Sequence, residues 1–280
     1  MPKDLASLVA ATPELAAMPA TSAQLLKLLE EPDTPGADIV AVIEKDPGLT
    51  ANLLKLANSA YYGLRREVAS ARDALVMLGS RTVLTMAFAA SMGRLLQMPV
   101  TAYRLPRGQL WRHCLAVGLL ATRLVPGGGG AGGRNRVFTA GVVHDLGKLL
   151  LDRPLRERLE VLPQDLDADG LVRAERQLLG FDHAEAGAKL AAAWNFPTDL
   201  VDVIAGHHAP APAGGMTAVV RAADLIASRN GHDGGAPRVS DGQLAQAIEA
   251  AGLDPARTGE LVDQSLRDLD GLLVLLGADA

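Results

Sequence analysis

The residues best suited to chemistry in this 280-residue chain are its imidazoles and two of its carboxylates. Five of the six histidines lie between positions 113 and 208. In sequence order the candidate group is His113, His144, Asp145, His183, His207, His208 and Asp224. Imidazole and carboxylate together suit divalent ions such as Fe, Mn, Zn, Co or Ni. One tetrahedral site needs about four ligands, so seven candidates are enough for two ions, and two neighbouring ions can hydrolyse a phosphoester.

Each candidate also has an ordinary structural interpretation. A single histidine in a helix is more often a hydrogen-bonded core residue than a ligand, because short motifs are weak signals alone. Lys148 either steadies a substrate phosphate or ends a helix at the surface, where it favours the helix dipole. Cys114 is expected to be a buried structural thiol, and His232 a solvated loop residue. The seven candidates are informative because all of them occur together in one chain.

Helical periodicity runs through the chain and predicts the elements that must position these side chains. The predicted helices that carry or flank them are 108–124, 136–150, 169–179, 182–194, 198–206 and 217–229. His144 and Asp145 fall inside the predicted helix 136–150, where adjacent side chains diverge by about 100°. Both can then reach one centre only across their shared edge, or if the helix is distorted near Gly147. Asp224 shares a helical stripe with Val220, which directs its carboxylate toward the core.

Capping signals predict where helices begin. Asp46 followed by Pro47 is typical of an N-cap with proline at the first helical position. Thr21 and Gln24 have the spacing of a capping box. Similar signals mark further helix starts at Ser70, Ser240 and Asp254.

The same patterns predict an all-α fold. No stretch of four or more residues alternates as a strand does, and the core must be built from Ala, Leu and Val because 49% of residues are hydrophobic but only 3% aromatic. The helical pattern lapses over 99–106, which predicts a boundary between an amino-terminal part, 1–104, and a second part, 105–280. The glycines between 127 and 133 lack the spacing of a phosphate-binding loop, so they predict a flexible linker between helices.

Composition excludes several classes of protein. The balance of 27 Lys and Arg against 32 Asp and Glu gives a net charge of −5, which argues against nucleic acid as a partner. The longest apolar stretch without a charge, 82–93, is far shorter than the ~20 residues of a membrane helix. The amino terminus makes a poor secretory signal, and the single cysteine cannot form an intramolecular disulfide. We therefore expect a cytoplasmic protein with neither a membrane nor a nucleic-acid partner.

The order of the candidate ligands, with Gly141-Val-Val-His-Asp-Leu-Gly-Lys148 at its centre, resembles the HD superfamily of metal-dependent phosphohydrolases. Other segments resemble the HDOD family, an HD-related output domain of bacterial signalling proteins. These are Asp46-Pro-Gly-Leu-Thr-Ala-Asn-Leu-Leu-Lys-Leu-Ala-Asn-Ser-Ala-Tyr-Tyr-Gly63, residues 74–79, Asp182-His-Ala-Glu-Ala-Gly187, Trp194-Asn-Phe-Pro197 and Gly206-His-His208. The resemblance covers about residues 14 to 230.

This resemblance implies an all-α fold in which an amino-terminal helical bundle packs on an HD-like helical half. It also implies a regulatory or interaction module, often one without demonstrated catalysis. By position, four residues match the basic metal ligands of HD enzymes: His113, His144, Asp145 and Asp224. Three more match the extra ligands of two-metal members: His183, His207 and His208. The related HD enzymes that hydrolyse cyclic di-GMP, the HD-GYP type, carry a Glu beside the histidine pair and a Gly-Tyr-Pro loop. Residues 209–215 of this chain have neither, which argues against cyclic di-GMP hydrolysis.

Two functions remain open at this stage. In the first, the chain is a bacterial HDOD-type signalling protein that acts through an unidentified protein partner and retains its metal site. In the second, it is a metal-dependent phosphohydrolase acting on a nucleotide or another phosphoester, with Asp145 bridging two ions and Lys148 stabilising developing charge. A third possibility is that the site binds metal for a structural or sensory role and hydrolyses no substrate. In the first case the Asn58–Gly63 segment forms either a surface recognition loop or a packed corner against the second half, and the corner is favoured because paired tyrosines bury well with their hydroxyls at an edge.

Overall fold

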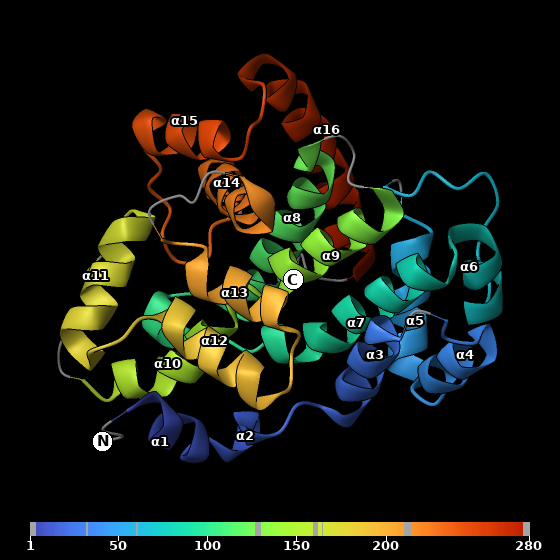
Figure 1. Ribbon diagram of the computed structural model, residues 1–280, viewed down its shortest axis with the longest axis horizontal. Coiled ribbons are helices and arrows are strands. Elements are labelled where there is room, and N and C mark those ends of the chain that lie inside the picture. The colour runs from blue at the N-terminus through green and yellow to red at the C-terminus, as the bar shows by residue number, and fades with distance from the viewer. Residues whose placement is uncertain are drawn as a thin grey trace.

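The computed structural model describes residues 4–31, 33–59, 61–126, 130–158, 162–163, 165–209 and 214–276. Within these ranges the chain forms helices, joined by turns and loops that contain two isolated β-bridges and no strand. The prediction of an all-α fold is confirmed (Figure 1).

The helices follow one another with short connections. The first part of the chain forms α1 (Leu5–Ala10), α2 (Pro13–Ala16), α3 (Ala20–Glu30), α4 (Gly36–Glu44), α5 (Pro47–Ala57), α6 (Ala71–Leu78), α7 (Ser80–Leu96) and the 3₁₀ helix η1 (Thr101–Tyr103). The second part forms α8 (Gln109–Leu124), α9 (Gly130–Val143), α10 (Leu146–Arg156), α11 (Ala168–Leu179), α12 (His183–Ala193), α13 (Thr198–Gly206), α14 (Gly215–Arg229), α15 (Asp241–Ala250) and α16 (Pro255–Leu276). The helices predicted over 108–124, 169–179, 182–194 and 198–206 are observed to within one residue at each end.

Most of the predicted helix caps are formed. The backbone N–H of Leu49 donates to the Asp46 carboxylate at 3.0 Å, and Ser240 forms a full capping box. The capping box expected at Thr21 is wrong, because α3 has already begun and its cap, Pro19, makes no side-chain bond. A proline immediately before the helix presets the backbone there, so Thr21 lies inside the first turn.

Part of the glycine-rich segment predicted as a linker is helical instead. Gly130, Gly132 and Gly133 belong to α9, while residues 127–129 lie outside the described ranges and the prediction is untested there. Glycine in a helix costs about 1 kcal/mol relative to alanine, but α9 packs closely along α8. Tertiary packing therefore outweighs the local preference of the glycines.

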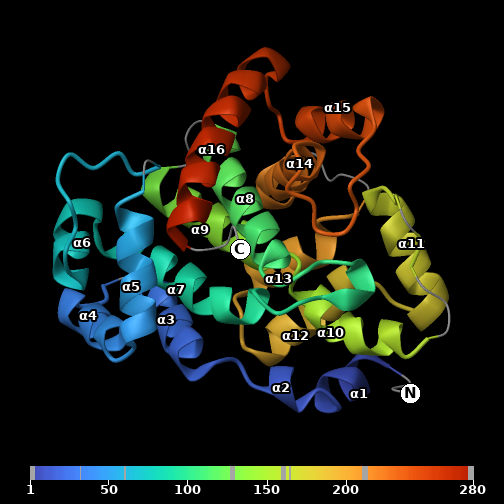
Figure 2. The same cartoon turned by 180° about the vertical axis from the view of Figure 1, so that it is seen from behind.

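Helix α8 lies at the centre of the second part and packs against α9, α14 and α16. Helix α7 joins the two parts of the chain, since it packs on α3 and α5 and also on α9 (Figures 1 and 2). The first two helices lie away from α4–α6 and pack on α12, where the Trp194 indole N–H donates to the Leu15 carbonyl at 3.0 Å. The division at residues 104 and 105 stays a prediction.

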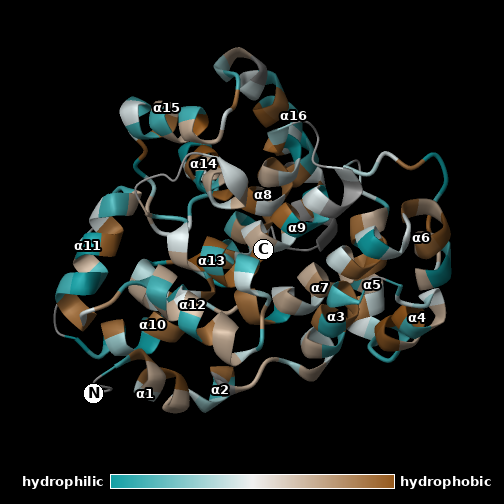
Figure 3. Ribbon diagram, viewed as in Figure 1, coloured by the Kyte–Doolittle hydropathy of each residue, from teal (hydrophilic) through white to brown (hydrophobic). Residues whose placement is uncertain are grey.

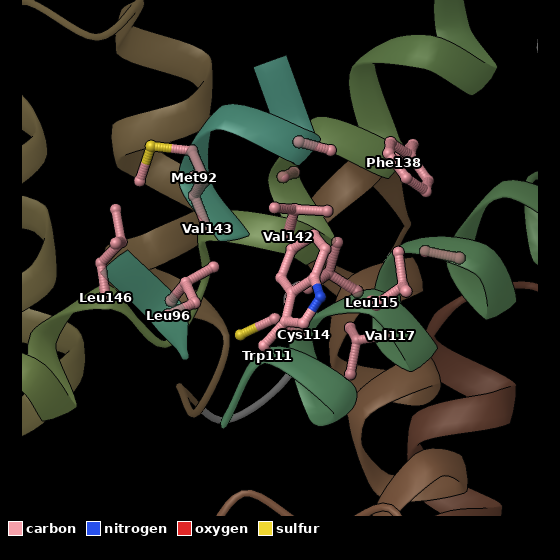
Figure 4. Packing of buried hydrophobic residues seen from close by; sticks show 14 of the residues in the cluster. Met92, Leu96, Trp111, Cys114, Leu115, Val117, Phe138, Val142, Val143 and Leu146 are labelled. Carbon is pink, nitrogen blue, oxygen red and sulfur yellow. The ribbon is translucent and has the colours of Figure 1, made fainter. Parts of the chain in front are cut away.

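The core is continuous through α7 and α8. Residues 83–93 of α7 are all buried, α8 is buried over 113–121, and several of the other helices carry both hydrophobic and hydrophilic residues (Figure 3). In Figure 4, Trp111 and Cys114 of α8 lie beside Leu96 of α7 and Val142 of α9. Cys114 is fully buried, as expected for a structural thiol, and this burial raises its pKa.

The segment that follows α5 forms the packed corner expected from the sequence, apart from Ala60, which lies outside the described residues. The Asn58 amide both donates to and accepts from the backbone of Val68, at 2.9 and 2.8 Å. The Arg123 guanidinium of α8 lies 5.0 Å from the centre of the Tyr61 ring. This cation–π contact ties the corner to the second half of the chain.

None of the helices in the described ranges is both long enough and apolar enough to cross a membrane.

A close approach between α10 and α12 requires glycine at position 147. A Cβ atom there would lie 1.8 Å from the His183 carbonyl oxygen and 2.6 Å from the Gly187 nitrogen. Both neighbours are backbone atoms, so no side-chain rotation can make room. Gly147 therefore allows the start of α10 to lie directly against the start of α12, which carries His183.

We expect Gly147→Ala to lower the free energy of unfolding by about 3 kcal/mol, because the added methyl overpacks a backbone contact. Gly242 occupies the same position in α15, the second of the helix, and its Cβ would meet nothing within 4 Å. Gly242→Ala should therefore be neutral or stabilise by up to about 1 kcal/mol. Urea unfolding of both variants measures the difference, and equal stabilities would contradict the assigned role of Gly147.

A second prediction concerns the Asp46 cap, whose pKa lies below its usual value of 3.8 because of the Leu49 N–H bond, and which also bonds Arg94. Asp46→Ala should cost about 1 kcal/mol at neutral pH. Because the pKa is lowered on folding, this stabilisation is present above pH 3.8 and is lost as the pH falls through the folded-state pKa. Denaturant unfolding at neutral and acidic pH checks it, with the surface variant Asp263→Ala as control. If the difference in unfolding free energy between the wild type and Asp46→Ala did not change with pH, the prediction would be contradicted.

Candidate metal centre

The structure brings all seven predicted ligands together from five places in the chain. His113 comes from α8, His144 and Asp145 from the turn between α9 and α10, His183 from the first residue of α12, His207 and His208 from the end of α13, and Asp224 from α14. They form two groups in which the donor atoms lie within 4.8 Å of one another. Residues up to 111 positions apart in sequence thus share one centre, at the meeting point of these helices in Figure 1.

The expected continuous helix over 136–150 is wrong, and its break explains how adjacent residues reach one centre. Helix α9 ends at Val143 and α10 begins at Leu146. Between them Asp145 has φ −98° and ψ 12°, outside the helical region, and acts as the N-cap of α10. The side chains of His144 and Asp145 therefore do not diverge as on a regular helix, and both point into the centre.

The first group consists of His113, His144 and Asp224, with Asp145 beside them. The Nε2 atom of His113 lies 3.2 Å from Nε2 of His144, 3.3 Å from Oδ2 of Asp145 and 3.3 Å from Oδ1 of Asp224. His144 Nε2 lies 3.5 Å from the same Oδ2 atom of Asp145. Four donor atoms from four residues thus surround one point.

The second group consists of Asp145, His183, His207 and His208. Here the other carboxylate oxygen, Oδ1 of Asp145, lies 3.4 Å from Nε2 of His183 and 3.7 Å from Nε2 of His207. The Nε2 atoms of His183 and His208 are 2.9 Å apart. Asp145 therefore presents one oxygen to each group, which is the arrangement of a bridging carboxylate.

The buried imidazoles are all oriented through Nδ1. His113 donates to the His232 carbonyl at 2.7 Å, and His144 and His207 donate to carbonyls three residues earlier at 2.7 and 2.8 Å. His183 donates to the Glu175 carboxylate at 2.7 Å. Because carbonyls and carboxylates only accept, Nδ1 carries the proton and Nε2 is left with its lone pair. This is the orientation that metal-ligating histidines take.

In the neutral rings the Nε2 lone pairs of His113 and His144 face each other 3.2 Å apart, with no hydrogen between them. Asp145 Oδ1 and His207 Nε2 are buried with no hydrogen-bond partner in the described residues. Donor atoms that each bind one ion at about 2.0–2.1 Å lie about 3.0–3.4 Å apart. The spacings in both groups are close to this range, so the residues fit a divalent metal.

The centre also carries an excess of buried negative charge. Asp145, Asp224 and Glu175 are buried, and the only buried ammonium among the described residues belongs to Lys148, whose Nζ lies 2.5 Å from Oδ2 of Asp145. Burial would raise the pKa of Asp145, but Lys148 and the histidines hold it well below its usual range. A buried charge without compensation is costly, so this site favours a further cation.

Burial and charge set the protonation of the imidazoles. Burial lowers the pKa of His144 to about 3, and burial together with His207 lowers that of His208 well below its usual value. Burial also lowers the pKa of His113, but Asp145 and Asp224 outweigh it and raise the pKa above its usual value. His144 and His208 are thus neutral at physiological pH, the form that binds metals.

Sequence reasoning missed Glu175, which is fully buried. Its carboxylate accepts from the backbone N–H of His183 at 2.9 Å, from the ring of His183, and from the hydroxyl of Tyr103 at 2.7 Å. The signal was available, because Glu175 lies on the apolar stripe of α11 four residues after Leu171. A glutamate in such a stripe needs a buried partner.

The loop between α14 and α15 covers the first group, and the sequence did not predict this. His232, expected to be solvated, is half-buried, and its carbonyl holds the His113 ring. A Cβ on Gly234 would lie 2.7 Å from Asp145 Oδ2 and 2.8 Å from His113 Nε2. The backbone of Gly234 therefore lies directly over the donor atoms. Lys148 is likewise buried on Asp145 rather than exposed at a helix end.

The chain resembles other proteins in sequence and structure. A protein of uncharacterised function from Treponema pallidum is 28% identical over 200 residues, which are 68% of this chain and 37% of that protein. The chain thus spans little more than a third of the length of that relative. A Shewanella amazonensis protein, provisionally named a phosphohydrolase, is 26% identical with a TM-score of 0.72, covering 98% of each chain.

An HDOD domain protein of unknown function from Geobacter sulfurreducens has the same fold, with a TM-score of 0.71, 21% identity, and 97% and 99% of the two chains covered. The sequence model of the HDOD domain matches residues 15–210, which is well over half of the chain. This protein therefore belongs to the HDOD domain family.

Proposed function

We propose that the chain is a regulatory HDOD module that holds divalent metal in a sealed centre and acts by contact with a protein partner rather than by turnover. The observation that carries the proposal is the closure of the centre. Six of the seven candidate ligands are buried, and the backbone of Gly234 lies over the donor atoms of the first group.

The metal is held by the seven residues in two groups. His113, His144, Asp145 and Asp224 hold one ion, and Asp145 with His183, His207 and His208 holds the second. Fe, Mn, Zn, Co and Ni all suit this mixture of imidazole and carboxylate. The support is the pair of opposed lone pairs at 3.2 Å and the excess of buried carboxylates, both of which a cation would relieve.

A sealed metal suits a structural or sensory role. A phosphoester substrate has to reach the centre, but the first group is covered by the 231–235 loop and the Lys148 ammonium is engaged by Asp145 at 2.5 Å. The ligands come from α8, α12, α13, α14 and the turn between α9 and α10. Metal binding would therefore stabilise the packing of these helices against one another, and metal loss would loosen it.

The alternative function is a metal-dependent phosphohydrolase acting on a nucleotide or another phosphoester. Asp145 facing both groups favours it, as does the provisional name of the Shewanella relative. Two bound ions would supply Lewis-acid activation of water and of the phosphoryl oxygen. In this alternative Lys148 leaves Asp145 to stabilise charge on the phosphoryl group, and the 231–235 loop moves aside to admit substrate.

The metal itself is tested by elemental analysis of protein purified without chelator. We expect bound divalent metal in the wild type, a reduced amount in Asp224→Asn, and no change in Asp202→Asn, whose carboxylate is exposed on α13. Because a ligand of the folded state stabilises it by about 2.7 kcal/mol at a hundred times its Kd, chelator should lower the Tm of the wild type. A metal-free protein with a Tm that chelator does not change would refute the metal centre.

Substitution of Gly234 tests whether the 231–235 loop closes the metal centre. The methyl group of Gly234→Ala would collide with Asp145 and His113, and the backbone there is outside the left-handed region, so only space opposes the substitution. We expect metal affinity to fall at least about tenfold, or about 1.4 kcal/mol. Gly242→Ala, with open space around it, should leave metal affinity unchanged.

Phosphoesterase assays distinguish a regulatory module from an enzyme. Metal-loaded wild type should not hydrolyse bis(p-nitrophenyl) phosphate or nucleoside phosphates above the background rate. Turnover that disappears in Asp145→Asn while the metal-free stability is retained would establish the phosphohydrolase instead.

A further inference from the structure

A cavity of about 580 Å³ lies away from the metal centre, and none of the seven candidate ligands lines it. Its walls come from α6, α7, α8, α9, α16 and the corner after α5. It therefore lies between the amino-terminal helices and the second part of the chain. Its volume is within the range of about 300–1,000 Å³ of small-molecule sites.

Three aromatic rings line the cavity. Tyr61 and Tyr62 meet edge to face, with ring centres 4.9 Å apart, and Phe138 of α9 contributes a third ring. Only 3% of this chain is aromatic, so three rings around one cavity are a local concentration. Aromatic rings of this kind provide stacking and edge contacts for a planar ligand.

The lining of the cavity also offers hydrogen-bond donors and positive charge. Arg123 and Arg134 both line it, and the lining residues include no Asp or Glu. Arg123 is paired with Asp268, but no carboxylate in the described part of the chain pairs with Arg134. The amide nitrogen of Asn135 is buried without an acceptor. The guanidinium of Arg134 is exposed and can bind an anionic oxygen, and the buried Asn135 amide lacks the acceptor that a carbonyl or anionic oxygen would supply.

We propose that this cavity binds a planar aromatic ring that carries a phosphate, with a nucleoside monophosphate as its representative. Arg134 binds the phosphate, the Asn135 amide donates to an oxygen of the ligand, and the ring lies against Tyr61, Tyr62 and Phe138. No residue of the metal centre takes part, so the inference does not depend on the proposed function.

The position of the cavity gives its ligand access to both parts of the fold. Helices α8 and α9 form an antiparallel pair, and the cavity lies at the end of this pair that carries Arg123 and Asn135. The metal centre lies at the other end, with His113 and His144. At 1.5 Å per residue, the separation along each helix is about 14 Å.

Calorimetric titration of the 280-residue chain tests the site, with AMP, adenosine and ribose 5-phosphate as probes. AMP should bind, and adenosine and ribose 5-phosphate should each bind at least about tenfold more weakly, because each lacks one of the two recognised features. Arg134→Ala and Asn135→Ala should each weaken AMP binding about tenfold, while Arg107→Ala, an exposed arginine outside the cavity, should not. Thermal unfolding of each variant shows that it is folded.

Three results would overturn the inference. The first is no binding of AMP at millimolar concentration by the folded wild type. The second is AMP affinity unchanged in both Arg134→Ala and Asn135→Ala, which would place the nucleotide elsewhere, including at the metal centre. The third is ribose 5-phosphate binding as tightly as AMP, which would mean that the ring is not recognised.

Discussion

The fold depends most on a cluster of buried groups that repel one another unless a cation lies among them. Three carboxylates and four imidazoles are buried together, and the Lys148 ammonium is the only buried ammonium among the described residues to oppose the carboxylates. Every Nδ1 of the four buried rings donates outward, so every Nε2 atom faces inward. Such an arrangement is unfavourable in an apolar interior, where unpaired polar groups are costly. The surrounding helices hold it in place, and a bound cation would turn mutual repulsion into shared attraction.

The helices achieve this through two local departures from regular structure. The chain leaves helical geometry at Asp145, so that neighbouring side chains converge on one point. Gly147 then lets α10 lie against the backbone of α12, which brings His183 to the same point. The Glu175 carboxylate fixes His183 and is itself held by Tyr103. Metal centres depend on such outer partners because they set the tautomer and direction of each ligand.

The metal centre and the aromatic cavity occupy opposite ends of the same helix pair. Each end joins different parts of the chain: the centre joins α8, α12, α13 and α14, and the cavity joins α7, α8, α9 and α16. Both are polar interruptions in a core that is otherwise built from Leu, Ala and Val. In the proposed regulatory role, a ligand would strengthen or weaken the packing of particular helices. The α8–α9 pair is positioned for that, since ligands at either end would contact the same two helices.

The sequence alone determined the helical class, several helix ends and the identity of the seven candidate ligands. These are local properties: the Asp46 and Ser240 caps depend on residues within one turn, and the order of histidines and carboxylates is visible without coordinates. Three further features follow from packing between distant residues: the helix around His144 breaks, Lys148 is buried on Asp145, and Glu175 and the 231–235 loop belong to the centre. The helical pattern of 136–150 was uninterrupted in sequence, and the glycines before it suggested a linker. Neither the continuous helix nor a linker over Gly130, Gly132 and Gly133 is observed. Packing between residues far apart in the chain contributes more free energy than the weak conformational preferences of neighbouring residues.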